Sequence, residues 1–69
     1  MTPNMIEALE IAITFDGEPP TDQRVHVLYP ETIDQALAMV QRHAKPWDIP
    51  VIWTRKTTLH HTPWQEWDH

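Results

Sequence analysis

Apolar and polar side chains alternate along the first part of the chain, from Glu7 to Asp16. This period of two is typical of a β-strand with one face toward a core, here formed by Leu9, Ile11, Ile13 and Phe15. A turn-rich segment follows from Gly17 to Asp22, where two prolines supply no ladder donors and the chain's one glycine permits a positive φ. Alternation resumes over residues 24–29, so we expect a second strand that forms a hairpin with the first.

A helical pattern begins at Thr32, which has the capping-box spacing to Gln35. Apolar residues then recur at helical spacing as far as Ala44, and Pro46 ends the helix because the residue before a proline avoids the helical region. A third strand is predicted over 49–56, with Ile49, Val51 and Trp53 toward the core. Thr62 to Gln65 repeats the capping pattern with a proline after the threonine, which predicts a short helical turn.

These elements predict an α+β fold of the order β-β-α-β. We expect a small, mostly antiparallel, single-layer sheet of three strands, with one helix on one face and a tryptophan-containing C-terminal tail with a short helical turn. A right-handed crossover places the third strand parallel to the second, and the first strand, which alternates most cleanly, suits the centre of the order 2-1-3. A chain of 69 residues has room for one domain over 1–69, with 1–5 and 57–69 as tail-like segments.

The second face of the predicted sheet mixes apolar residues such as Ala12 and Ile52 with polar ones, and therefore needs a cover. The C-terminal tail, a foreign protein or a second copy of the chain could provide it, and the last case predicts a homodimer. The absence of cysteine and of an apolar leader or span indicates a soluble, cytoplasmic protein without membrane association.

The chemistry available to the chain is limited. It contains no serine, no cysteine and no glycine-rich loop, which removes the commonest nucleophiles, thiolate metal sites and phosphate cradles. His60 and His61 are adjacent, so an extended backbone directs them to opposite sides, unlike the i, i+4 pair of a zinc helix. We expect no enzyme activity, no catalytic residue, no metal and no cofactor. A small His-dependent or metal-dependent hydrolase that acts through His60, His61 and a carboxylate is an alternative.

Charge and tryptophan are unevenly distributed along the chain. The net charge is −5, and residues 1–23 contain five acidic residues and no Lys or Arg. Such a surface attracts basic partners and repels phosphate backbones. All four tryptophans lie in the last 23 residues, and Trp64 and Trp67 would share one face of a helical turn. We expect a non-catalytic acidic protein-binding module whose contact residues are Glu7, Glu10, Asp16, Glu18, Asp22, Trp64 and Trp67.

In size and charge the chain is similar to small phage and mobile-element inhibitors that occlude nucleic-acid-binding machinery, including some anti-CRISPR proteins. The similarity implies an inhibitor of a partner with a basic or nucleic-acid-binding surface. A second alternative is single-stranded nucleic-acid binding, because cations and rings interleave in the set Trp47, Trp53, Arg55 and Lys56. The whole chain has only five Lys and Arg, which disfavours direct contact with nucleic acid.

Overall fold

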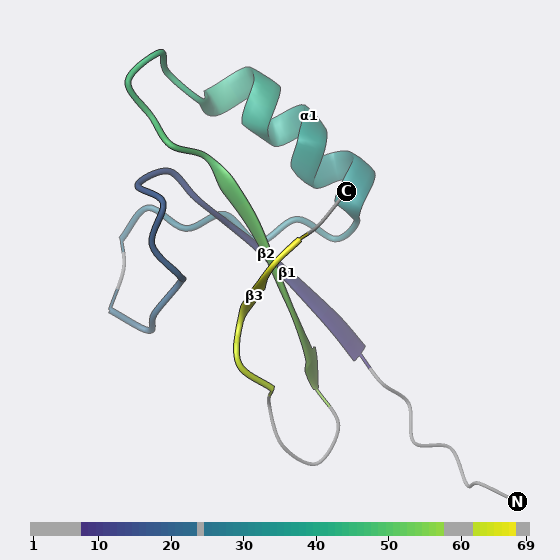
Figure 1. The fold of residues 1–69 in the computed structure, drawn as a ribbon. Coiled ribbons are helices and arrows are strands. Elements are labelled where there is room, and N and C mark those ends of the chain that lie inside the picture. The colour runs from purple at the N-terminus through teal and green to yellow at the C-terminus, as the bar shows by residue number, and fades with distance from the viewer. Residues whose placement is uncertain (1–7, 24, 58–61, 68–69) are drawn as a thin grey trace, which may run out of the picture.

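The structure is a computed structural model that describes residues 8–23, 25–57 and 62–67, and it confirms a small α+β fold (Figure 1). The elements are β1 (Ala8–Thr14), α1 (Ile33–His43), β2 (Val51–Thr57) and β3 (Gln65–Glu66). The three strands form an antiparallel sheet in the order β1-β2-β3, and α1 lies between β1 and β2 in the chain. The helix packs on one face of this sheet (Figure 1).

The predicted strand order 2-1-3 is wrong, because β2 occupies the centre and the expected second strand does not form. Within residues 25–29, pairing with β1 is limited to one bridge, in which Ile13 and Leu28 exchange backbone hydrogen bonds of 2.9 and 3.2 Å. Pro30 follows at once and has no N–H to continue a ladder. The neighbouring Tyr29 is largely exposed, whereas Leu28 of the same segment packs against the core cluster.

The helix start is confirmed. The Gln35 amide donates to the Thr32 hydroxyl oxygen at 3.1 Å, which caps the first turn. The Gln35 side-chain oxygen reaches back to the amide of Glu31 at 2.7 Å, one residue before the position used in a standard capping box. At the other end the Ala44 amide donates to the carbonyl of Val40 at 3.0 Å, and the helix stops before Pro46 as expected.

The core is small and is formed by Ile11 and Ile13 of β1, Ala36 of α1 and Ile52 of β2. Ile13 lies directly opposite Ile52 in the sheet, so both present their side chains to the helix. The predicted phase of β2, with Val51 and Trp53 toward the core, is therefore wrong by one residue. The sequence around Ile52 is apolar in both phases, so alternation alone does not specify which face is buried.

Leu9, an expected core residue of the first strand, is exposed, and so is Val25 in the segment expected to form the second strand. Leu9 precedes the buried part of β1. Val25 belongs to the segment that does not pair as a strand, so neither side chain is held over the hydrophobic cluster.

The C-terminal tail adds a strand to the sheet, and the predicted helical turn over Thr62 to Gln65 is wrong. Pro63 cannot donate a hydrogen bond, and Thr62 instead donates its amide to the Lys56 carbonyl at 3.0 Å while its hydroxyl accepts the Lys56 amide at 2.9 Å. The Trp67 amide donates to the Ile52 carbonyl at 2.7 Å. The edge of β2 offers unsatisfied backbone groups, and pairing with them outweighs the local capping pattern.

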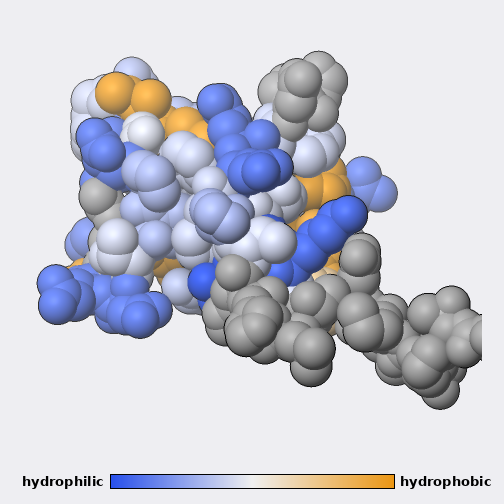
Figure 2. Space-filling model, turned by 60° about the horizontal axis from the view of Figure 1, so that its bottom comes forward, coloured by the Kyte–Doolittle hydropathy of each residue, from blue (hydrophilic) through white to orange (hydrophobic). Residues whose placement is uncertain are grey.

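Figure 2 views the molecule from the end at which β1 begins and β2 ends, and most of the described surface there is polar or only weakly apolar. Strongly apolar side chains reach this surface at separate places near its margins. No helix among the described residues is long and apolar enough to cross a membrane.

Candidate functional site

The two tryptophans expected to form a shared platform lie in different environments. Trp67 packs against the hydrophobic core cluster, and the guanidinium of Arg55 lies over the Trp64 ring, with Arg55 Cζ 4.3 Å from the ring centroid. Residues three apart in an extended strand point to opposite faces, which explains why the two rings separate once the tail becomes β3. Both side chains are half-buried, so each contributes to the packing of this chain.

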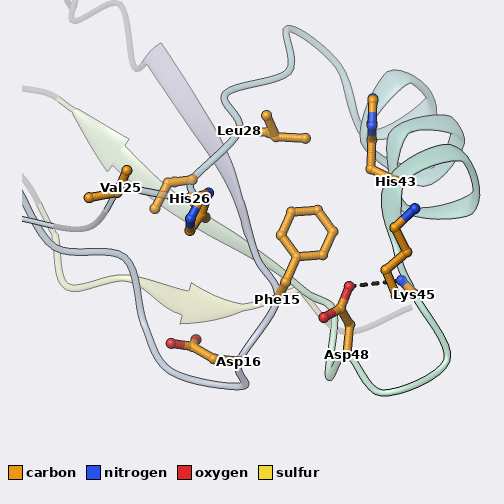
Figure 3. A pocket seen from close by; sticks show the side chains of 9 residues that line it. Phe15, Asp16, Val25, His26, Leu28, His43, Lys45 and Asp48 are labelled. Atoms are coloured by element: carbon orange, nitrogen blue, oxygen red, sulfur yellow. Dashed lines mark hydrogen bonds between the residues drawn. The ribbon is translucent and has the colours of Figure 1, made fainter.

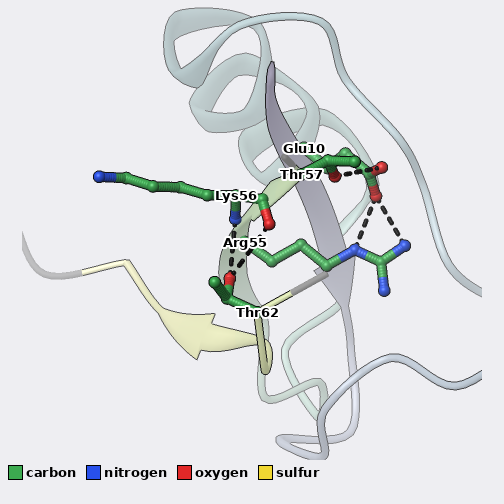
Figure 4. A network of polar contacts seen from close by, with 5 residues as sticks. All are labelled: Glu10, Arg55, Lys56, Thr57 and Thr62. Atoms are coloured by element: carbon green, nitrogen blue, oxygen red, sulfur yellow. Dashed lines mark hydrogen bonds and ion pairs between the residues drawn. The ribbon is translucent and has the colours of Figure 1, made fainter. Parts of the chain in front are cut away.

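A polar network covers the sheet face opposite the helix (Figure 4). Glu10 and Arg55 are direct cross-strand neighbours, and Arg55 donates from Nε and Nη2 to Glu10 Oε2 at 2.7 Å each. The hydroxyl of Thr57 donates to Glu10 Oε1 at 2.9 Å. One predicted protein-binding residue and one predicted nucleic-acid-binding residue therefore bind each other and hold β1 against β2.

The predicted nucleic-acid set is not brought together as one platform. The Trp53 indole Nε1 donates to the Thr14 hydroxyl at 2.8 Å, which directs the ring over β1. Lys56 is exposed near the end of β2, whereas Trp47 lies before its start, in the turn that follows α1. With Arg55 paired to Glu10, the rings and cations of this set do not form a continuous groove for a strand.

The acidic set lies mainly in the connection after β1. Asp16 accepts the amide of Glu18 through Oδ1 at 3.0 Å, which fixes the start of this loop, and the side chains of Glu18 and Asp22 are exposed. Glu7 lies outside the described residues. The acidic loop, defined here as residues 16–22, carries three carboxylates and no Lys or Arg.

An open groove of about 690 Å³ lies beside this loop, between the end of β1, residues 25–28 and the C-terminal end of α1 (Figure 3). Phe15 and Leu28 belong to the fringe of the hydrophobic core, so the floor of the groove continues the core toward the surface. Figure 3 shows His26 on one side of Phe15 and His43 with Lys45 on the helix side. The full lining is Phe15, Asp16, Val25, His26, Val27, Leu28, His43, Lys45 and Asp48.

Backbone contacts hold the two sides of the groove together. The Ile49 amide donates to the Phe15 carbonyl at 2.9 Å, and the Gly17 amide donates to the Ile49 carbonyl at 3.0 Å. Gly17 has φ of 78°, and a Cβ at this position would lie 3.3 Å from Ile49 Cγ2, so a glycine suits this turn on both grounds. Asp48 accepts the backbone amide of Lys45 through Oδ2 at 2.8 Å, which orders the turn after the helix.

Exposed apolar side chains lie in the groove lining or next to one of its lining residues in the chain. Val25, which lines it, is 85% exposed, and Trp47, between Lys45 and Asp48, is 78% exposed. Ile49 follows Asp48 and is 60% exposed. Large apolar side chains left in water next to a concavity are typical of a surface that binds a partner.

Sequence reasoning missed most of this groove. The residues that line it come from three segments distant in the chain, and only the tertiary fold brings His26, His43, Lys45 and Asp48 together. One local signal is present: Pro46 and Pro50 enclose the short segment Trp47-Asp48-Ile49. This segment cannot form a regular helix or central strand and therefore tends toward the surface.

Within the described residues no group of three or more His, Asp or Glu side chains is placed to hold a metal ion. His60 and His61, on which the hydrolase alternative depends, lie outside them. Comparison with protein-family models, curated proteins and solved structures found no match to this chain.

Proposed function

We propose that this chain is a non-catalytic protein-binding module that docks a partner with a basic surface at the groove. One observation carries the proposal: the exposed Val25 lines an open groove next to an acidic loop, and the exposed Trp47 and Ile49 flank its lining residue Asp48 in the chain. Burial of such side chains against a partner is worth about 1.5–3 kcal/mol each when it is complete.

Charge supports a basic partner. The acidic loop lies beside the groove, and the whole chain carries a net charge of −5. Exposed carboxylates at the rim of an interface accelerate approach of a basic surface, and apolar contacts at its centre slow release. A small module of this kind acts by covering a surface, so inhibition by occlusion of a basic or nucleic-acid-binding partner is the activity that we favour.

Direct binding of single-stranded nucleic acid is less favoured. Its expected contacts Trp53 and Arg55 are engaged within the sheet by Thr14 and Glu10. Catalysis is less favoured too: His26 and His43 line the groove, but the chain has no Ser or Cys to serve there as a nucleophile.

The test is capture of a partner from an extract of the native host by the intact, tagged protein. Val25→Asp places a charge at the groove, and Leu9→Asp makes the same change at an exposed apolar residue of β1 that does not line it. We expect a partner that the wild type and the Leu9 variant retain and that the Val25 variant loses. Equal capture by all three would overturn the proposed site.

Changing the ionic strength separates the contribution of the acidic loop to binding from that of the apolar contacts. Binding of the captured partner should weaken as salt rises, because screening shortens the range of the attraction to about 10 Å at 0.1 M and about 3 Å at 1 M. Affinity that does not change with salt would remove the acidic loop from the interface and leave only the apolar contacts.

A further inference from the structure

The groove has distinct chemistry at its two ends. In Figure 3 Leu28 lies at one end, Phe15 lies in the middle, and the carboxylates of Asp16 and Asp48 lie on either side of the base of Phe15 at the other end. The apolar part continues the hydrophobic core, and the acidic part adjoins the loop that carries Glu18 and Asp22. A ligand that matches both ends must carry an apolar group and a cation close together.

Asp48 is the carboxylate best placed to receive that cation. Its Oδ2 accepts the Lys45 backbone amide at 2.8 Å, which holds the side chain in position. Figure 3 shows the Asp48 carboxylate directed toward Phe15, while the end of the Lys45 side chain extends toward His43. The ammonium of Lys45 is thus turned away from the acidic end of the groove.

We propose that the groove binds a short segment of a partner protein in which an aromatic or aliphatic residue is flanked by Lys or Arg. The apolar side chain packs between Phe15 and Leu28, and the neighbouring cation pairs with Asp48 under the added field of the acidic loop. This inference rests on the proposed function and specifies the chemistry of the partner. Charge complementarity selects such a segment over an acidic one, because like charges at the acidic end would repel.

Three capped pentapeptides test the two requirements separately: Gly-Lys-Phe-Lys-Gly, Gly-Glu-Phe-Glu-Gly and Gly-Lys-Gly-Lys-Gly. Each is titrated into ¹⁵N-labelled full-length protein to about 5 mM, a range that detects millimolar dissociation constants. We expect the first peptide to shift the amide signals of Phe15, Leu28 and Asp48. The other two should bind at least about tenfold more weakly.

A matched pair of variants localises the charge effect. Asp48→Asn removes the charge but keeps an oxygen that can accept the Lys45 amide, and Glu66→Gln makes the same change of net charge on β3, away from the groove. Asp48→Asn should weaken the preference for lysine over glutamate, the acidic loop supplying what remains of it, and should retain the preference for phenylalanine over glycine. Glu66→Gln should alter neither preference, and the amide spectrum of each variant shows whether it is folded.

Three results would overturn the inference: no shift with the first peptide, equal binding of the Lys and Glu peptides to the wild type, or shifts confined to residues outside the groove. If host capture still depends on Val25 while the peptides do not bind, this inference fails and the proposed function stands. If the first peptide binds in the groove with the expected preferences while capture is independent of Val25, the chemistry of the groove stands and the proposed function fails.

Discussion

The phase of β2 can be tested with two neighbouring residues that differ in the face they present. Ile52 is 8% exposed and lies opposite Ile13 in the core, whereas Val51 is half-buried on the other face. We expect Ile52→Thr to destabilise the protein strongly and Val51→Thr to have little effect. Both substitutions introduce the same β-branched residue, so strand propensity changes little in either case.

The size of the effect follows from the atoms that change. Ile52→Thr removes a buried methyl group, worth about 1 kcal/mol, and places a hydroxyl in the core, which costs about 1–3 kcal/mol without a hydrogen-bond partner. The total is about 2–4 kcal/mol. A chain of this length has a free energy of unfolding of about 3–10 kcal/mol, so Ile52→Thr removes a large part of it. Val51→Thr should cost less than about 1 kcal/mol because the hydroxyl can reach water.

Urea unfolding followed by tryptophan fluorescence measures these changes. With a slope of about 1 kcal/mol per molar, Ile52→Thr should lower the midpoint by about 2–4 M. If that variant is unfolded without urea, Ile52→Val provides the measurable case, with an expected loss of about 1 kcal/mol. Equal losses for Val51→Thr and Ile52→Thr would refute the assigned phase of β2, and with it the placement of Trp53 and Arg55 opposite the helix.

Three other changes test local contacts by the same unfolding assay. Thr32→Ala removes the cap of α1 and should cost about 1 kcal/mol, and Thr32→Ser should recover most of the loss. Gly17→Ala should cost about 1–2 kcal/mol, because φ is 78° and the new Cβ would lie 3.3 Å from Ile49 Cγ2; a loss near zero would show that this turn adapts. A double-mutant cycle of Glu10→Gln and Arg55→Gln should give a coupling of about 0.5–1 kcal/mol that falls as salt rises, whereas zero coupling at low salt would exclude a stabilising ion pair.

The elements that the sequence predicts well are those that residues close together in the chain determine. Alternation with no interior proline defines β1, and the Thr32 cap with Pro46 beyond the end defines α1. The errors arise where local patterns are ambiguous or compete with pairing elsewhere. Residues around Ile52 are apolar in both phases of a strand, so the buried face is decided by Ile13 on a distant strand.

The tail shows the same competition more directly. Thr62 and Pro63 carry a helix-start signal, but a single helical turn gains little from it because helix nucleation is unfavourable. The edge of β2 offers backbone groups that Thr62 and Trp67 satisfy at 2.7–3.0 Å, and Trp67 gains a place against the core. This outcome also separates the two tryptophan rings, which the local sequence of the tail does not predict.

The proposed site lies away from the sheet face opposite the helix, because the side chains on that face already contact one another. On the face opposite the helix, Arg55 is held by Glu10 and Trp64, and Trp53 is held by Thr14. Because β1 and β2 are antiparallel, the end of β1 and the start of β2 lie at the same end of the molecule. The two most exposed large apolar residues, Val25 and Trp47, and the acidic loop lie in the connections, and the groove lies between the end of β1, residues 25–28 and the C-terminal end of α1. Binding there leaves the internal contacts of the sheet intact. A partner at the groove should therefore tolerate Arg55→Gln at full affinity once the protein is folded, whereas binding through the sheet face would not.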